Sequence, residues 1–576
     1  MSSTHPNNPT LAIFTGPYAG PSTIEHIESL INQFPDLRIA IFQQTRTTPP
    51  LRRRIRTKLK RLRKQPLSYP LELITESAAR LATTRKPKHQ PDPNFAFPAN
   101  LQQLAQQHNL IYHATPSLHN NQTLQLIRDL NPTLGLALAA PILKRPLFSI
   151  PKQGTINLHK SCLPNYKGMP PGFWELHDNA ETTGVTVHEI DDSLDTGRII
   201  HQQQLTIQPF TTPRGLALQI DQLASQTLPE AIGQLLTSTA QPIEQPLSAS
   251  PPNSRPAYLT KRRIESHRQA NRKQATQRPA PPKRIVKQAV FTAYAKTIAP
   301  LRNATRSNAT GCHTTVLLYH RVSDEFIDNV TVGVEQFEQQ MSFLAARYQI
   351  VSLDTMLAER NTPLNKPRVV ITFDDGYADN YLAALILRRL GIPATFYIST
   401  AIVGTDRPFA HDTEKIGRAV PTLTWKQIEQ MHGWGFTIAN HTAHHTDCGT
   451  TPADLVLSEI AHASSELNKR LGPGCGSKHF AFPFGRPEHI QPAVVQALPE
   501  IGIDSCASAH GGINHTGFDP YNILRCGIEA AHTLASLNAI IEGWRQPESG
   551  EQATGSGMGA VNQENASHAP PLRRSA

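Results

Sequence analysis

The sequence predicts an α/β protein, and three observations support this prediction. Short apolar runs that fit buried strands alternate with longer segments that have the spacing of amphipathic helices. The chain has 576 residues, of which 39% are hydrophobic, so it is long and apolar enough to form more than one buried core. Two groups of reactive polar residues lie far apart in the sequence. We therefore expect two separate sites on one polypeptide.

The first apolar segments predict a parallel sheet at the N-terminus. Leu11 to Gly16 reads as a strand, Ile24 to Phe34 as a helix and Leu37 to Phe42 as a second strand, which together form a βαβ unit. Gly16 and Gly20 do not form the glycine pattern of a dinucleotide site. The alternation continues with a helix, a second helix and a strand, at Leu101 to His108, Thr123 to Leu130 and Leu134 to Ala140.

Between these segments lies a strongly basic run, Arg52 to Lys64, which contains no acidic residue. Ile55, Leu59 and Leu62 recur at helical spacing, so the run can form an amphipathic helix. Two interpretations stay open: a solvated helix face, or a surface that contacts phosphate groups, RNA or an anionic membrane. The net charge of the chain, +11, favours anionic partners only in a general way.

The first reactive group lies in the segment Gly154 to Gly168. Asn157 and His159 alternate along a predicted strand, so their side chains face the same side, and Asp195 lies downstream. These are the components of an acyl-transfer site. A neutral His takes a proton from an attacking amine, an Asn amide donates to the oxyanion, and an Asp orients the imidazole.

This segment resembles the folate-dependent formyltransferases in two motifs, the run from Asn157 to Gly168 and the later Asp195-Thr-Gly. The resemblance implies a Rossmann-like formyltransferase domain over residues 1–240, with Asn157, His159 and Asp195 as its catalytic set. It implies 10-formyltetrahydrofolate as the donor. The residues implied to bind this cofactor are Ser161, Leu163, Pro164 and Gly168.

The segments after this region narrow the choice of acceptor. Members that act on methionyl-tRNA carry a β-barrel domain here, but Leu216 to Leu236 reads as a helix and Thr239 to Pro256 as a Pro- and Ser-rich loop. Residues 241–312 read as a basic, Pro-rich linker. We expect a small amine, such as an amino sugar or nucleotide sugar, and no stable nucleic-acid partner. A tRNA or peptide amine remains the alternative, with the second domain then acting as a binding module.

The second reactive group begins at the end of a buried strand. Val369 to Phe373 is apolar and leads into Asp374 and Asp375, which on a turn can both face one pocket. Further on, His441 and His445 are four residues apart, and one helical turn would place both imidazoles on the same side. One carboxylate and two imidazoles make a three-ligand site with positions open for water, as in a catalytic metal centre.

This region resembles the polysaccharide deacetylases with NodB homology, through the residues above and the third motif, Phe480 to Gly485. The resemblance implies a distorted (β/α) barrel over residues 313–545. It implies Asp375, His441 and His445 as ligands of a divalent metal, commonly zinc, and Asp374 as the general base. Ala481 stands where many members carry a basic residue. The late Leu-x-x-His motif of a general acid is missing, so the general acid is unassigned, with His320 and His510 as candidates.

The sequence also predicts the helices and the short strand around the second reactive group. Helices are expected at Val334 to Ala346, Leu382 to Leu390 with Gly391 as its C-cap, Leu423 to His432 and Pro452 to Leu471, with a short strand at Ile350 to Leu353.

The first residues lack the pattern of a signal peptide, no apolar run reaches the length of a membrane span, and the six Cys form no C-x-x-C pair. We therefore expect a cytoplasmic enzyme with both activities, and a disordered tail at 546–576.

Overall fold

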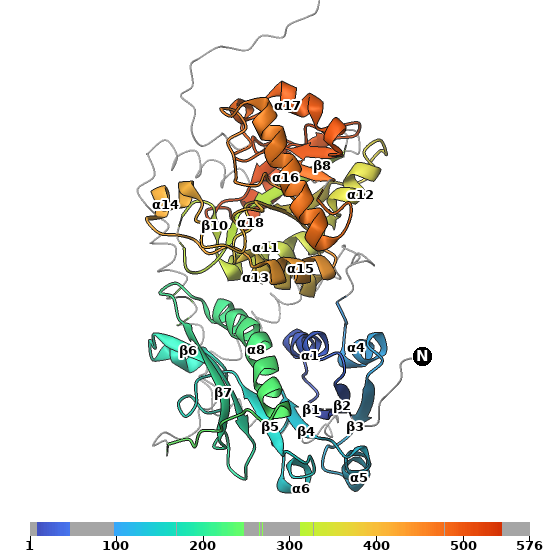
Figure 1. The fold of residues 1–576 in the computed structure, drawn as a ribbon, viewed down its shortest axis with the longest axis vertical. Helices are drawn as coiled ribbons and strands as arrows, with labels where there is room; N and C mark the ends of the chain where they lie inside the picture. Colours follow the sequence, from blue (N-terminus) through green and yellow to red (C-terminus); the bar gives the residue numbers. More distant parts are fainter. Residues whose placement is uncertain are drawn as a thin grey trace, which may run out of the picture.

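A computed structural model describes residues 8–45, 97–246, 264, 266, 268 and 312–543, apart from residues 169, 327 and 477. The basic run at 52–64, most of the 241–312 segment and the tail from 546 lie outside the described residues, so the predictions made for them stay predictions. The described chain forms two large α/β units, one built on each of two sheets (Figure 1).

The first sheet has seven strands in the order β3-β2-β1-β4-β5-β6-β7. β1 to β5 pair in parallel, and β6 and β7 continue the sheet in antiparallel fashion. The order 3-2-1-4-5 of the parallel strands is that of a Rossmann-like sheet, so the predicted βαβ opening is confirmed. The strands are β1 Thr10–Thr15, β2 Arg38–Gln44, β3 Ile111–Thr115, β4 Leu134–Leu138, β5 Thr155–His159, β6 Thr182–Glu189 and β7 Ile199–Thr206.

Side chains alternate between two apolar layers on the two faces of this sheet. Along β1, Ile13 belongs to the core under α1 and α8, whereas Phe14 belongs to the core on the opposite face. The longest described helix, α8, begins after its N-cap Thr212 and contacts α1, β6 and β7. The helices are α1 Pro21–Gln33, α4 Leu101–Gln107, α5 Asn121–Leu130, α6 Arg145–Phe148, α7 Phe173–His177 and α8 Pro213–Leu236.

The second sheet has nine strands and is mostly parallel. Its main path is β16-β15-β14-β13-β12-β8-β17, with β11 paired to β12 and β18 paired to β8. Among these described strands, only β17 runs antiparallel to its neighbour, as expected for a distorted barrel closed by its last strands. The strands are β8 His313–Tyr319, β11 Gln349–Ile350, β12 Arg368–Phe373, β13 Thr395–Ile398, β14 Thr437–Asn440, β15 His479–Ala481, β16 Ser505–Ala507, β17 Asn514–His515 and β18 Arg525–Gly527, beside a small pair, β9 Arg321–Val322 and β10 Thr331–Val332.

The helices around the second sheet agree closely with the predicted pattern. Gly391 ends α13 with φ 65°, the left-handed C-cap that the sequence predicts. The strand expected at 350–353 is shorter, because Ser352 caps a helix that begins at Leu353. The helices are α11 Val334–Arg347, α12 Leu353–Ala358, α13 Asn380–Leu390, α14 Ala410–Ile416, α15 Trp425–Gly433, α16 Ala453–Leu471, α17 Pro492–Ala497 and α18 Leu534–Ile541, with 3-10 turns at Pro487–His489 and Pro499–Ile501. Within the described ranges, no helix combines the length and apolar character of a membrane span.

Two candidate active sites

In the first sheet, Asn157, His159 and Asp195 come together around a fourth residue, His188. Asn157 on β5 lies directly opposite His188 on β6, and its Nδ2 is 3.1 Å from His188 Nε2. One oxygen of Asp195 is 3.7 Å from His159 Nδ1 and the other is 3.7 Å from His188 Nε2. The three residues predicted from sequence therefore meet at one place, with His188 between them.

The hydrogen bonds of the two imidazoles fix which nitrogen carries a hydrogen. His188 Nδ1 is 2.8 Å from the carbonyl of Glu189, so it donates there, and its Nε2 accepts from the Asn157 amide. Burial, together with the neighbouring His159, lowers the pKa of His188, which favours this neutral form. His159 Nε2 donates to the carbonyl of Tyr166 at 3.1 Å, so its Nδ1, beside Asp195, is the nitrogen that can take a proton.

The residues predicted to bind the folate lie on the loop after β5. The Gly168 amide donates to Asp195 at 3.0 Å and so holds that carboxylate in place. The buried Ser161 hydroxyl donates to Glu175, and the buried Leu163 amide donates to Thr186 at 3.1 Å. These contacts fix the shape of the loop. A direct contact of Ser161, Leu163, Pro164 or Gly168 with a folate stays a prediction.

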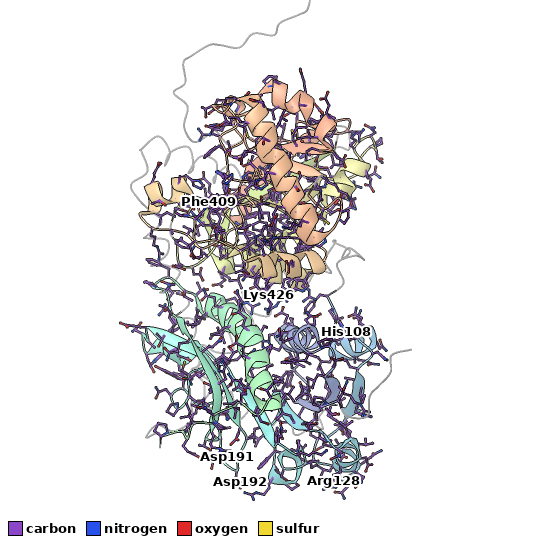
Figure 2. The ribbon with its side chains drawn as sticks, viewed as in Figure 1. His108, Arg128, Asp191, Asp192, Phe409 and Lys426 are labelled. Atoms are coloured by element: carbon purple, nitrogen blue, oxygen red, sulfur yellow. The ribbon has the colours of Figure 1, made fainter. Side chains whose placement is uncertain are left out.

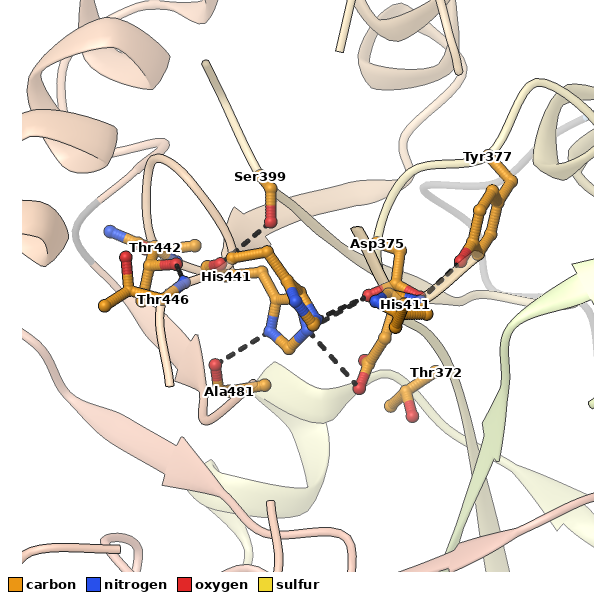
Figure 3. A network of polar contacts seen from close by, with 12 residues as sticks. Thr372, Asp375, Tyr377, Ser399, His411, His441, Thr442, Thr446 and Ala481 are labelled. Atoms are coloured by element: carbon orange, nitrogen blue, oxygen red, sulfur yellow. Dashed lines mark hydrogen bonds and ion pairs between the residues drawn. The ribbon is translucent and has the colours of Figure 1, made fainter. Parts of the chain in front are cut away.

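In the second sheet, Asp375, His441 and His445 form a compact ligand set. Asp375 Oδ1 is 3.4 Å from His441 Nε2 and 3.1 Å from His445 Nε2, and one ligand atom from each residue lies within 4.8 Å of the others. His441 Nδ1 donates to the Ala481 carbonyl at 2.8 Å, which leaves Nε2 with its lone pair toward Asp375 (Figure 3). A donor set of two imidazoles and a carboxylate, with one imidazole oriented by a carbonyl, fits a divalent metal such as zinc.

The predicted helical turn that carries both histidines is wrong. Residues 441–448 form a loop after β14, not a helix. The Asn440 side chain accepts from the Thr442 amide at 2.9 Å, and Thr442 and His445 have φ 60° and 56°, in the left-handed region. The turn at each of these residues, rather than the pitch of a helix, brings the two imidazoles to one side.

Asp374 faces the same site, and it has a partner that none of the sequence motifs contains. Arg525 on β18 holds it with two bonds, Nη1 to Oδ1 at 2.6 Å and Nη2 to Oδ2 at 2.8 Å, while its Nε donates to the Ser508 carbonyl at 2.7 Å. Arg525 therefore gives Asp374 a basic partner, although the residue at position 481 is Ala. It lies well beyond the third motif, in a segment to which the sequence pattern assigns no role.

Burial and neighbouring charges shift the pKa values of several groups in and around the metal-ligand set. Burial acts to raise the pKa of Asp375, but the adjacent imidazoles of His441 and His445 outweigh this effect, and the pKa of Asp375 is well below its ordinary value. Burial acts to lower the pKa of His441, yet Asp374 and Asp375 raise it. His320, a candidate acid, is near both carboxylates, and burial lowers its pKa. The concentration of negative charge is one that a bound cation would neutralise.

Aromatic rings line one side of the metal-ligand set. The His445 ring is 4.9 Å from Phe484, 5.3 Å from Phe409 and 5.1 Å from His411, measured between ring centres. Phe409 is labelled in Figure 2, beside α14. Phe484 is 44% exposed, so it offers an apolar surface next to the ligands. His411 Nε2 is 3.1 Å from the Tyr377 hydroxyl. His411 lies in none of the sequence motifs, so the sequence alone does not indicate its position beside the ligands.

Strained backbone gathers at both sites. Among the described residues, eleven that are not glycine have positive φ, and six of them belong to these two sites. Such residues persist where the surrounding contacts hold them, and they cluster at functional positions. The six are Tyr166, Asp195, Asp375, Thr442, His445 and Phe484.

The fold and these two sites define an α/β protein with two enzyme-type centres. A family model described as "Formyl transferase" matches residues 55–232, and one described as "Polysaccharide deacetylase" matches residues 361–505. The chain therefore carries one region that is similar to each of these two enzyme families, as the sequence motifs predict.

Individual relatives match one part of the chain at a time. The methionyl-tRNA formyltransferase of Trichlorobacter lovleyi is 32% identical over 154 residues, which are 27% of this chain and 49% of that protein. The chain thus spans about half the length of the curated relatives it matches. Among solved structures, a Streptococcus pyogenes deacetylase, PplD in complex with acetate, is 22% identical with a TM-score of 0.34, over 40% of this chain and 99% of that one. Phosphoribosylglycinamide formyltransferase from Bacillus halodurans is 16% identical with a TM-score of 0.28, over 40% and 95%.

Proposed function

We propose that the chain is a bifunctional enzyme. One site transfers the formyl group of 10-formyltetrahydrofolate to the amine of an amino sugar or nucleotide sugar, and the other hydrolyses an N-acyl group on a carbohydrate with a divalent metal, which we expect to be zinc. The supporting observation is that two sets of reactive side chains, each assembled from distant parts of the sequence, meet within short distances of one another.

In the transfer reaction, the acceptor nitrogen attacks the formyl carbon, and the bond from that carbon to the donor nitrogen breaks. His159 takes the proton of the attacking amine at Nδ1, and Asp195 stabilises the resulting imidazolium until the proton passes to the donor nitrogen as it leaves. One amide hydrogen of Asn157 is bound to His188, and its second hydrogen can donate to the developing oxyanion. The Gly168 amide keeps Asp195 beside the imidazole.

In the hydrolysis, Asp375, His441 and His445 would hold the metal. When bound, a divalent metal lowers the pKa of a water ligand and polarises the amide carbonyl. Asp374 takes a proton from the attacking water, and Arg525 fixes the orientation of its two oxygens. The carbon–nitrogen bond then breaks as the proton held by Asp374 passes to the leaving nitrogen, directly or through solvent, and the products are a carboxylic acid and the free amine.

The two reactions are chemically related, because hydrolysis makes an amine and formylation consumes one. The sites can therefore act in series, replacing an acetyl group by a formyl group, or in opposition, by adding and removing a formyl group. None of the six cysteines, which all lie among the described residues, is paired in a disulfide, and this suits the cytoplasmic location that we propose, where a reduced folate donor would be available.

The experiment uses the purified full chain with 10-formyltetrahydrofolate and amino sugars or nucleotide sugars, N-acetylated or free. His159→Asn should lower formyl incorporation at least about 100-fold and leave acetate release intact. Asp375→Asn should do the reverse and lose bound metal, measured by elemental analysis. His108→Asn and Asp406→Asn, both at exposed positions, are the matched controls. Formyl incorporation that survives His159→Asn, or acetate release that survives Asp375→Asn, would contradict the assignment of that site.

A second candidate has its own support, because the curated relatives matched by the first region are named methionyl-tRNA formyltransferases. In this alternative the acceptor is a tRNA or a peptide amine, and the second unit is a binding module. Retention of tRNA that falls with salt and is lost when Arg52 to Lys64 is neutralised would favour it. Formylation of sugar amines without retention of tRNA would favour the first candidate.

A further inference from the structure

The two units contact each other through α1 and α8 on one side and α11 and α13 on the other (Figure 1). We infer that this contact is a permanent docking surface, and that the two units are one rigid body that unfolds cooperatively rather than two domains on a tether. The inference concerns the assembly of the chain and is independent of the proposed function.

Two adjacent arginines at the end of α13 form the centre of this surface. Arg388 binds Glu28 on α1 with two bonds, of 2.6 and 2.8 Å. Arg389 binds Glu25 on the same helix through both Nε, at 2.7 Å, and Nη2. The side chains of both pairs are no more than 11% exposed. Bidentate pairs require a fixed relative orientation of the two groups, so they specify how the units dock.

The ion pairs extend into the first unit and form a network with no net charge. Arg389 also reaches Asp221 on α8 at 3.3 Å, and the other oxygen of Asp221 accepts from Lys160 at 2.6 Å. Three cations therefore balance three anions at the contact: two arginines come from the second unit, and one lysine and all three carboxylates come from the first. Lys160 is the residue directly after His159, so the network connects α13 of the second unit to the end of the strand that carries the first site.

Asp324 of the second unit makes a second contact, at the N-terminus of α8. Asp324 is fully buried and accepts from the amide of Thr212, the N-cap of α8, at 3.4 Å, and from the amide of Val334, the first residue of α11, at 3.2 Å. One carboxylate thus serves the N-termini of two helices from different units, where negative charge is favoured. A Cβ at Gly215 would lie 2.1 Å from Asp324 Oδ2, so α8 has a glycine where this carboxylate approaches it.

Apolar packing also crosses the boundary. Leu218 on α8 is 1% exposed and belongs to the main apolar cluster of the second unit, together with Phe337 and Leu385. The Arg388 guanidinium lies 5.0 Å from the ring of Phe97 in the first unit and 4.7 Å from that of Trp434 in the second. Guanidinium groups stack on aromatic rings in this way at desolvated contacts. The surface therefore combines an apolar cluster, buried ion pairs and helix caps, which a weak transient contact would not need.

The test is a charge swap in the full chain, measured by differential scanning calorimetry. Wild type should unfold in one transition. Arg389→Glu should split it into two, or lower its midpoint by roughly 5–15 °C, because it leaves Glu25 and Asp221 facing a third carboxylate. Glu25→Arg should act likewise, and the double variant Glu25→Arg/Arg389→Glu should restore a single transition. Lys426→Glu makes the same change of charge at an exposed position on α15, labelled in Figure 2, and should leave the transition unchanged.

A second measurement needs no variant and covers the case in which the single reversals fail to fold. Native-state hydrogen exchange of the wild-type chain can be monitored by mass spectrometry in increasing urea. The backbone amides of α8 and α13 should then exchange through one common unfolding transition. Two independent transitions in wild type, or an Arg389→Glu variant that unfolds as wild type does, would overturn the inference.

Discussion

The ion pair between Arg525 and Asp374 gives the sharpest prediction. Arg525 is fully buried, and burial acts to lower its pKa, but the charge of Asp374 outweighs this effect and the pKa of Arg525 is raised. In Arg525→Met, the Asp374 carboxylate keeps its buried position and loses two charge-assisted hydrogen bonds.

The expected cost can be worked out from these two bonds. Each hydrogen bond to a charged group is worth about 1.5–3 kcal/mol, and breaking one side of a buried ion pair typically costs about 3–5 kcal/mol. We therefore expect Arg525→Met to destabilise the folded chain by about 4 kcal/mol and to lower the midpoint of its single unfolding transition by roughly 5 °C. If Asp374 is the general base, hydrolysis should also fall at least about 100-fold.

The assay is a double-mutant cycle measured by urea unfolding. Replacing both partners of a buried pair costs less than replacing one, so Asp374→Asn/Arg525→Met should be at least about 2 kcal/mol more stable than Arg525→Met alone. Arg360→Met, at an exposed position in the same unit, is the control. Additive effects in the cycle, or an Arg525→Met variant within about 1 kcal/mol of wild type, would refute the reasoning.

Three further predictions concern the two sites and α1. His188→Gln should lower kcat for formyl transfer more than it raises KM, because the Asn157 amide loses the acceptor that orients it. An unchanged kcat in steady-state kinetics would contradict this role of His188. His445→Ala should abolish stoichiometric metal binding in elemental analysis while the unfolding midpoint of the metal-free protein changes by only a few degrees, and full metal occupancy would contradict the ligand assignment. Burial, aided by nearby cations, lowers the pKa of His26 to about 3, so the folded chain stays neutral there while the unfolded chain takes up a proton below about pH 6.5. Stability should therefore rise with pH over this window, and His26 should account for about 2 kcal/mol of the stability lost between pH 7 and pH 5. The urea midpoint of His26→Gln should change correspondingly less with pH than that of wild type. An equal pH dependence in both proteins would argue against this burial effect.

Much of the geometry of both candidate sites could be predicted, because their residues lie at strand ends in short local patterns. The spacing of Asn157 and His159 along one strand, and the position of Asp374 and Asp375 directly after another, each fix a direction for the side chains. The helix between His441 and His445 was wrong, because spacing of four residues does not distinguish a helical turn from a loop with left-handed residues, and the Asn440 side chain favours the loop.

The residues that were missed act across long sequence separations. Arg525 is 151 residues from Asp374, and the two meet only because β18 and β12 both pair with β8. Arg388 and Arg389 have the placement of ordinary cations in the last turn of a helix, and nothing local indicates that α1 supplies their partners. Contacts of this kind depend on the tertiary arrangement, which periodicity and motif spacing do not contain.

The position of β8 has a practical consequence for anyone who expresses part of this chain. The stretch recognised by similarity to the deacetylases, 361–505, begins after this strand and stops before Arg525. A recombinant fragment trimmed to those limits would lack the strand on which β12 aligns and the counter-ion of Asp374, so a lack of activity in that fragment would say nothing about the intact chain.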